Sequence, residues 1–432
     1  MSSVALTAPA PGRSAVGVGA ILFLSLFASQ AGLIVLSPVL AQVAADLDVS
    51  TAAAGQLRTV AGVASGTAAL ILAFSKTARR ATLRDLLIAG AALLAVASLA
   101  SAAAPGYAAL AAAQVLVGVA VALLVTAATA AAGEWSAPEQ RRQVLSWTLS
   151  GMPAAWIVGM PLIGVLGAVD WRYAWIALPF AAAGAAGLAA ATGPRSENRQ
   201  APNGSLLTAF EQPSTRRWLV GELLAGSAWT GTLVYSGALF SESYGISSTA
   251  TGVALGLVDV AFVGGTVLLP RLFRADARVV LIRLALALAA AVSLFGAVRP
   301  GVIASTVLLS VAAFLAGGRV LAGNAFGLDA DPPRRLAVMG ARTAANQYGY
   351  FVGSAVGGVA LAQAGYTGLG IVLGVLFAAA AMTLALGPVP HRASVRLTRW
   401  STASSALSRW STALRRSGSA EASNVPSLQP CS

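Results

Sequence analysis

Charged side chains inside long apolar stretches are the residues of this sequence best placed to do chemistry. Asp259 stands in the middle of an otherwise uncharged stretch, within the run GLVDVAF at 256–262. An ionised group at the centre of a membrane helix costs ~2.5–3.5 kcal/mol and usually faces a cavity or a partner. The position predicts one of two roles for this carboxyl. It exchanges a proton or pairs with a cationic solute, or it is a structural group bonded to a neighbouring helix or arginine.

Two arginines occupy comparable positions. Arg319 lies near one end of its apolar stretch, where a long side chain can extend to the interface. The alternatives for Arg319 are an anion site and an ion pair with Asp259. Arg58 lies near the start of another stretch and could extend to the interface in the same way. Its alternative is a gate ion pair with Asp46 or Asp48.

One further acid and several uncharged residues complete the set of candidates. Glu222 lies about one turn inside its stretch, as expected for an interfacial acid. Polar and aromatic residues that could contact a solute, or only pack between helices, are Gln30, Gln114, Trp229, Asn346 and Gln347. Small residues and prolines that could form a gate or a close helix contact are Gly151, Pro153, Gly159, Pro161 and Gly164.

The composition excludes most enzymatic and metal chemistry. Residues AVILMFWYC make up 57% of the 432 residues and charged residues only 10%, which is too apolar for a soluble domain. A single cysteine, Cys431, excludes a disulfide framework and a cysteine-ligated metal site. A single histidine, His391, removes most zinc and Ser-His chemistry. We therefore expect no metal, no cofactor and no enzymatic activity. A membrane-embedded transferase would need grouped carboxylates or histidines, whereas the acids here are scattered.

Uncharged stretches of about 20 residues predict membrane-spanning helices. Bounded by charges and by two Pro-Gly turns, they are 16–40, 55–75, 86–104, 108–133, 143–168, 173–192, 218–241, 249–270, 279–298, 301–324 and two helices within 343–390. We therefore expect an all-α polytopic membrane protein with twelve transmembrane helices. Its parts would be a cytoplasmic N-terminal segment at 1–15, six-helix bundles at 16–192 and 218–390, a cytoplasmic linker at 193–217, and a basic tail at 391–432, amphipathic or disordered.

Positive charge gathers on one side of the predicted membrane. With the N-terminus inside, lysine and arginine fall almost entirely in the inner loops, which is the bias of the positive-inside rule. We expect a monomeric multi-pass protein of the cell inner membrane with both termini cytoplasmic. The net charge of +13 predicts attraction to anionic lipid of the inner leaflet. It does not predict nucleic-acid binding, because the charges are spread over loops that carry no nucleic-acid-binding motif.

The two halves of the sequence repeat each other. The run VSTAAAG at 49–55 returns as ISSTATG at 246–252, an offset of 197, and Pro105-Gly106 returns as Pro300-Gly301, an offset of 195. A parallel duplication of six helices predicts two pseudo-symmetric bundles with a substrate site between them at mid-membrane.

Two motifs carry a resemblance to a known family. The first helix ends in SPVL at 37–40 and leads into AADLDVS at 44–50, and the fifth contains GMPLIGVLG at 159–167, followed by Asp170-Trp171-Arg172. These segments resemble the major facilitator superfamily and are most similar to its drug:proton antiporter and sugar-efflux group. The resemblance implies a cavity lined by the first, fourth, seventh and tenth helices. Gln114 stands where the family usually has an arginine.

The resemblance also implies a function. We expect a secondary active transporter that moves a small organic solute by alternating access, with proton-coupled efflux and Asp259 as the proton-coupling residue. Its partners would be the small-molecule substrate, protons and the lipid bilayer. The alternatives are a proton-linked or facilitative importer of a small metabolite and a non-transporting membrane sensor of the same fold.

Overall fold

The computed structural model describes residues 15–74, 81–137, 139–194, 210–272, 276–330 and 335–386. The first half contains α1 (Ala15–Ile34), α2 (Leu36–Asp46), α3 (Thr51–Phe74), α5 (Leu83–Ala102), α6 (Tyr107–Glu134), α7 (Arg141–Gly167), α8 (Trp171–Trp175), a π-helical turn η1 (Ile176–Phe180) and α9 (Ala181–Ala191). The second half contains α10 (Pro213–Tyr244), α11 (Ser248–Leu272), α12 (Ala277–Ala297), α13 (Val302–Ala330) and α14 (Arg335–Ala385). The expected cytoplasmic tail and most of the expected linker lie outside the described residues.

The described helices confirm an all-α polytopic membrane protein. Within this part of the chain, nine helical stretches are long and apolar enough to cross a membrane. One of them, α14, consists of two helices that meet at Ala364 and Gly365, where the backbone is not helical. The less apolar α3 and α10, of 24 and 32 residues, pack among the others. Division of α14 at this point turns the nine stretches into ten helices, and α3 and α10 bring the number in the described part of the chain to twelve. This number fits the twelve expected crossings.

Two of the expected helices are interrupted. The expected helix 16–40 is broken at Val35, between α1 and α2. Pro38 has no N–H to donate to the carbonyl of Ile34, so one helical hydrogen bond is missing at this turn. The backbone of Val35 nevertheless keeps helical angles, and Ala15–Asp46 forms one span. The expected helix 173–192 contains η1, which includes Pro179. Proline again removes one helical hydrogen bond, and the ladder widens locally.

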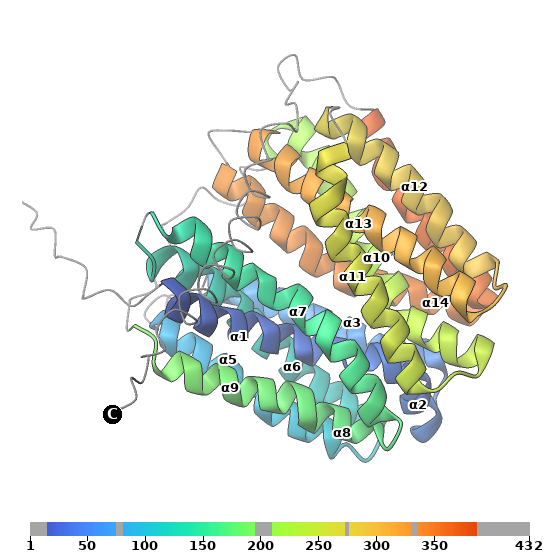
Figure 1. Cartoon of the computed structure of the whole chain (residues 1–432), viewed down its shortest axis with the longest axis horizontal. Coiled ribbons are helices and arrows are strands. Elements are labelled where there is room, and N and C mark those ends of the chain that lie inside the picture. The colour runs from blue at the N-terminus through green and yellow to red at the C-terminus, as the bar shows by residue number, and fades with distance from the viewer. Residues whose placement is uncertain are drawn as a thin grey trace, which may run out of the picture.

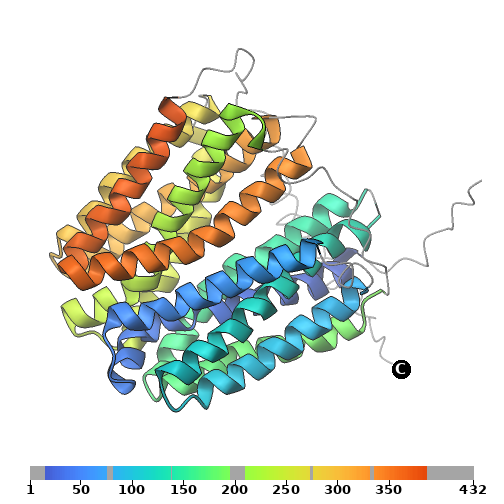
Figure 2. The same cartoon turned by 180° about the vertical axis from the view of Figure 1, so that it is seen from behind.

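The helices form two bundles, α1–α9 and α10–α14, which meet along three lines of contact. Figure 1 shows α7 beside α11, and Figure 2, seen from behind, shows α3 beside α14. The third contact joins α2 to α10. We call the α7–α11 and α3–α14 contacts the two seams. Figures 1 and 2 show them on opposite faces of the molecule.

The bundles touch most closely at the end that carries the short turns, around 47–50, 168–170 and 245–247. We call this the short-turn end. A Cβ atom added to Gly164 of α7 would lie 2.4 Å from the carbonyl oxygen of Ser248 and 3.0 Å from Cα of Gly252 on α11. A Cβ on Gly237 would lie 1.8 Å from the carbonyl oxygen of Ser37. Toward the other end, which carries the longer loops, the two groups of helices diverge (Figures 1 and 2).

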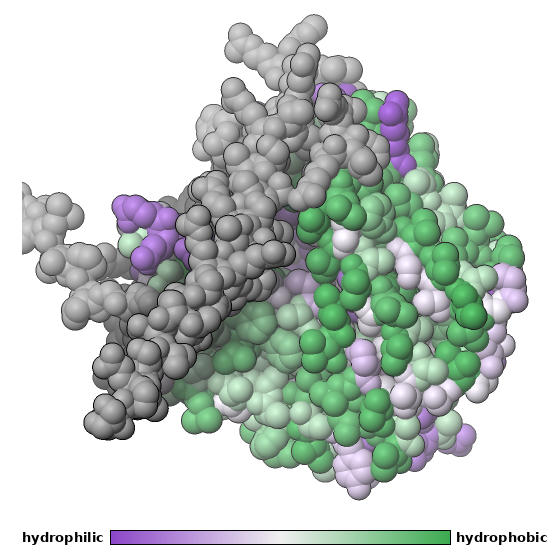
Figure 3. Space-filling model, in the orientation of Figure 1, coloured by the Kyte–Doolittle hydropathy of each residue, from purple (hydrophilic) through white to green (hydrophobic). Residues whose placement is uncertain are grey.

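The outer surface of the helices is apolar. Figure 3 shows hydrophobic residues over most of the coloured surface of this face, with hydrophilic residues mainly near its edges. Large exposed apolar side chains include Val253, Leu257 and Val260 on α11. An apolar outer face is what a lipid-facing helix needs, and Asp259 lies between these residues in the sequence but is itself buried.

Candidate functional site

Asp259 lies near the middle of α11, on the side that faces other helices. Its side chain is only 7% exposed, and its Oδ2 atom has no hydrogen-bond partner. One turn away, a Cβ on Gly256 would lie 2.9 Å from Pro161 of α7, and Phe262 stacks on Trp229 of α10 with the ring centroids 6.0 Å apart. The carboxyl therefore lies on the face of α11 that is turned toward α7 and α10.

The sequence left open that Asp259 is a structural group bonded to a neighbouring helix or arginine, but the described part of the chain offers no such partner. No hydrogen bond or ion pair joins Asp259 to a described residue. The expected alternative pairing with Arg319 is not formed. Arg319 is bound instead to Glu222, 2.8 Å away, because these two side chains face each other inside the second bundle.

Arg58 is buried rather than extended to the interface, which corrects the first expectation for it. Its side chain is 4% exposed. It donates a hydrogen bond to the carbonyl of Leu33, in the last turn of α1 before the break, and lies over the ring of Tyr350 on α14 at 5.2 Å from the centroid. The expected gate ion pair with Asp46 or Asp48 is also not formed: Asp46 pairs with Arg172 at 2.8 Å, and no ion pair joins Arg58 to Asp48 in the described part of the chain. The reason is that Arg58 lies two turns into α3 and points away from the short-turn end.

Gln30 and Gln114 are both buried within the first bundle. The Nε1 of Trp156 on α7 donates to Oε1 of Gln30 at 3.1 Å. The Nε2 of Gln114 donates to Ser101 of α5 at 3.3 Å, so this amide joins two neighbouring helices. Gln30 thus lies next to α7, the helix that forms one half of the α7–α11 seam. Gln114 instead forms a hydrogen bond between two helices of the same bundle, as packing residues do.

The candidate amides of α14 lie close to helices of both bundles. The Nε2 of Gln347 donates to Ser65 of α3 at 3.2 Å, across the seam. Asn346 lies beside α10, because a Cβ on Gly226 would approach its Oδ1 to 3.4 Å. These two neighbouring residues therefore face different helices.

The small residues of α7 divide between the bundle interior and the seam. A Cβ on Gly151 would meet the carbonyl of Phe23, and one on Gly159 would meet Ile34, both on α1. Pro161 and Gly164 contact α11 across the seam. Pro153 lies inside α7, between the two groups.

Two helix bundles meet along two seams, with Arg58 buried at one seam and Asp259 at the other. The sequence matches the Major Facilitator Superfamily over residues 22–328. The chain belongs to this superfamily. No curated protein matches it by sequence.

Solved transporters of the superfamily fold share the architecture. The chain is similar to the nucleoside transporter NupG, with 14% identity, a TM-score of 0.69, and 87% of this chain and 99% of that chain covered. It is similar to a D-xylose–proton symporter, with 16% identity, a TM-score of 0.68, and 88% of this chain and 98% of that chain covered. It is also similar to a bacterial homologue of the human lysosomal transporter Spinster in an inward-facing, unoccupied conformation. The identity is 12%, the TM-score is 0.63, and 87% of this chain and 95% of that chain are covered. At these identities the likeness concerns the fold alone.

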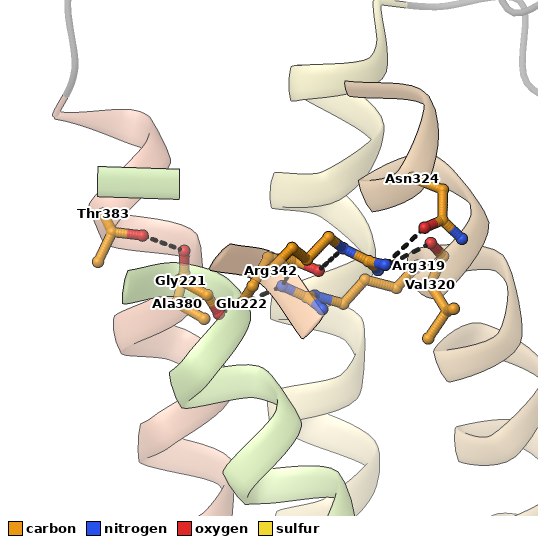
Figure 4. Close-up of polar contacts among 8 residues, drawn as sticks. All are labelled: Gly221, Glu222, Arg319, Val320, Asn324, Arg342, Ala380 and Thr383. Atoms are coloured by element: carbon orange, nitrogen blue, oxygen red, sulfur yellow. Dashed lines mark hydrogen bonds and ion pairs between the residues drawn. The ribbon is translucent and has the colours of Figure 1, made fainter. Parts of the chain in front are cut away.

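The C-terminal bundle of this superfamily member also holds a buried ionic cluster (Figure 4). Glu222 of α10 is 1% exposed, so the expectation of an interfacial acid is wrong. Its two carboxylate oxygens bind Arg319 of α13 at 2.8 Å and Arg342 of α14 at 2.7 Å. Arg342 also donates to Asn324 at 2.5 Å and to the carbonyl of Val320 at 3.2 Å. Three helices are thereby joined through one carboxylate.

The ionic cluster rules out two of the roles expected for Arg319, which are extension to the interface and an ion pair with Asp259. The side chain is 6% exposed and therefore does not extend to the interface. Reasoning from the sequence missed Arg342 altogether, because it lies at the edge of its apolar stretch. Arg342 and Asn324 are 18 residues apart and lie on different helices, so their spacing in the sequence does not predict that they are in contact.

Proposed function

We propose that this protein is a secondary active transporter that moves a small organic solute across the cytoplasmic membrane by alternating access, with proton-coupled efflux as its direction. The observation that carries the proposal is the Asp259 carboxyl, buried at the α7–α11 seam without a partner among the described residues. A buried carboxyl that can bind either a proton or a cationic group provides the coupling that an antiporter needs.

The contacts between the bundles support the alternating-access part of the proposal. The halves touch closely at the short-turn end and diverge toward the other end (Figure 1). With both termini cytoplasmic, as the arginine-rich loops favour, this arrangement would open toward the cytoplasm. Rocking of the bundles about the seams would then expose the site to the outside.

Efflux is favoured by the likeness of helix α7 to the antiporter motif, GMPLIGVLG at 159–167. The second candidate is proton-coupled uptake, and the observation that favours it is the structural similarity to a D-xylose–proton symporter. Both candidates place the proton on the same carboxyl, so they differ in the direction of proton movement relative to the solute.

The sign of proton movement separates the two candidates. The full-length protein would be reconstituted into vesicles that contain a pH-sensitive dye, and solutes of each charge class would be added outside without a pH gradient. Antiport makes the interior more alkaline, symport makes it more acidic, and both signs are independent of protein orientation. A facilitative carrier would move labelled solute with no pH change.

Asp259→Asn should abolish the coupled proton movement, because the amide cannot exchange a proton. Asp48→Asn is the matched control. Asp48 is exposed and has φ of 51°, a backbone conformation that asparagine tolerates. Coupled proton movement that survives Asp259→Asn unchanged would remove this residue from the mechanism.

A further inference from the structure

The repeated run that marks the two halves of the sequence has two hydroxyl groups side by side in each copy. The copies are VSTAAAG at 49–55, which enters α3, and ISSTATG at 246–252, which enters α11. The aligned pairs of hydroxyl residues are Ser50-Thr51 and Ser247-Ser248. An N-cap needs only one side-chain oxygen, so the second hydroxyl of each pair is available for another contact.

The first hydroxyl of each pair caps its own helix. The backbone N–H of Ala53 donates to the Oγ of Ser50 at 3.2 Å, and the N–H of Ala250 donates to the Oγ of Ser247 at 3.3 Å. Both bonds lie within a single helix, so they are the same whether the two bundles are together or apart.

The second hydroxyl of each pair crosses to the other bundle. The hydroxyl of Thr51 on α3 donates to the carboxylate of Glu242 on the last turn of α10. The hydroxyl of Ser248 on α11 donates to the carbonyl of Gly164 on α7 at 2.9 Å, and Thr249 donates to the same oxygen at 3.4 Å. Both crossing contacts lie at the short-turn end, one in each copy of the repeat.

A glycine one turn further along each helix allows the close approach. Gly55 and Gly252 follow the crossing hydroxyls by four residues, which places them on the same helix face. A Cβ on Gly55 would collide with the Tyr235 ring of α10, and a Cβ on Gly252 would collide with the carbonyl of Met160 on α7. Both glycines lie inside helices. The contact with the other bundle, and not the backbone conformation, therefore requires glycine here.

The carboxylate that Thr51 binds is held in place from within its own bundle. The second oxygen of Glu242 accepts a hydrogen bond from the hydroxyl of Tyr366 on α14 at 2.8 Å. Tyr366 directly follows the break in α14 at Gly365. Tyr366 thus acts as a positioning residue, since it fixes one oxygen of the carboxylate while the other binds the first bundle.

We propose that the two copies of the repeated run are paired latches that hold the short-turn end closed, and that both release before the protein opens at that end. The inference rests on the alternating-access part of the proposed function and names the groups that set its closed state. Each latch consists of a hydroxyl that crosses between the bundles and a glycine that admits the partner helix. The acceptor is charged in the α3 latch and neutral in the α11 latch, and hydrogen bonds to charged groups are the stronger kind.

Distances between the bundles, measured without solute, test the latches. Spin labels would be attached at Val169→Cys and Ile303→Cys in the full-length protein with Cys431→Ser, reconstituted in lipid. Val169 is 78% exposed and lies in a short turn of the first bundle. Ile303 is 81% exposed and lies close to Ser305, which forms a 2.6 Å hydrogen bond with Tyr244 at the short-turn end of α10. Double electron–electron resonance would then give the populations of the shorter, closed distance and the longer, open distance.

Removal of either latch should shift these populations. Thr51→Val removes one latch, and Ser248→Ala combined with Thr249→Ala removes the other. Each change should lower the closed-to-open ratio by ~2- to 13-fold, the range for one lost hydrogen bond, with Thr51→Val near the upper end. The latches share no partner, so the two factors should multiply when both are removed. Ser50→Ala and Ser247→Ala are the matched controls, because each removes the neighbouring hydroxyl and should leave the ratio unchanged.

A variant of the acceptor identifies the partner of Thr51. Glu242→Ala alone should lower the ratio about as much as Thr51→Val does. Added to Thr51→Val it should have little further effect, because the same hydrogen bond is already lost. Tyr366→Phe keeps the acceptor but not its support, so it should lower the ratio by a smaller factor. Thr51→Ser keeps the hydroxyl and should retain the original ratio.

Three results would overturn the latches. These are distances that do not change in the two latch variants, a shift as large in Ser50→Ala or Ser247→Ala, and a Glu242→Ala effect that adds fully to that of Thr51→Val. A single distance shared by all variants counts as the first result. Expected shifts in a protein that moves neither solute nor protons would reject the transport function alone, whereas transport with unchanged distances would reject the latches alone.

Discussion

A methyl group at position 164 should push the two bundles apart at the short-turn end. The Cβ of Gly164→Ala would lie 2.4 Å from the carbonyl oxygen of Ser248, whereas ordinary contacts begin near 3.4 Å. The helices must therefore separate by about 1 Å there, which also stretches the 2.9 Å hydrogen bond from the Ser248 hydroxyl to the Gly164 carbonyl. The strain exists only while this end is closed.

The size of the effect follows from the cost of overpacking. Extra atoms in a close-packed contact cost ~1–3 kcal/mol, and a coupling of that size changes an equilibrium ~5- to 150-fold. The closed-to-open ratio at the short-turn end should fall by this factor. Alanine is also a better helix former than glycine by ~1 kcal/mol, but α7 is helical in both states, so this gain does not change the ratio.

Labelling of a buried cysteine measures the ratio. Ser248 on α11 is 4% exposed and donates to the Gly164 carbonyl across the seam, so Ser248→Cys in a Cys431→Ser background should react with a membrane-impermeant maleimide only when the seam opens. Gly164→Ala should raise the labelling rate by the factor above. Gly184→Ala is the matched control, because a Cβ there meets no atom within 4 Å. Equal labelling of the two variants, with both folded, would refute the reasoning.

Two further substitutions contrast buried and exposed ion pairs. Glu222→Gln leaves two buried guanidiniums without their carboxylate and should destabilise the protein by ~3–5 kcal/mol. The measurement is the thermal stability in detergent, which should fall strongly. A small change in the unfolding temperature would mean that the cluster is solvated. Asp46→Asn breaks a pair whose side chains are 44% and 31% exposed, so it should cost only ~0–1 kcal/mol, and a loss as large as that of Glu222→Gln would contradict this distinction.

The sequence was sufficient for the positions of the helices and for the bundle plan. A membrane helix is a local property, because it depends on an uninterrupted apolar stretch and on the charges that bound it. The expected helix 108–133 matches α6 closely, at Tyr107–Glu134. The breaks at Val35 and around Pro179 were missed, although a proline marks each of them, since proline is common in unbroken membrane helices.

The partners of the charged residues could not be predicted in the same way. Glu222 and Arg342 are 120 residues apart, and nothing in either stretch indicates that the two helices bring them together. Arg58 was expected near the acids closest in sequence, but its partners are a backbone carbonyl on α1 and a ring on α14. Such contacts depend on how helices are rotated and packed, which hydropathy does not encode.

The distribution of contacts explains how the bundles can move without melting. Inside the second bundle, the Glu222 cluster joins three helices through buried ion pairs, which are costly to break. Across the seams, the buried and half-buried hydrogen bonds join neutral groups, such as Gln347 to Ser65 at 3.2 Å and Gln56 to the Ser354 carbonyl at 3.3 Å. Each neutral bond is worth only ~0.5–1.5 kcal/mol. Rocking the bundles therefore exchanges neutral hydrogen bonds and the contact of Arg58 with the Tyr350 ring, while the buried ion pairs stay within a rigid unit. Among the described residues, the unpartnered Asp259 carboxyl lies beside the α7–α11 seam, where the environment changes during rocking.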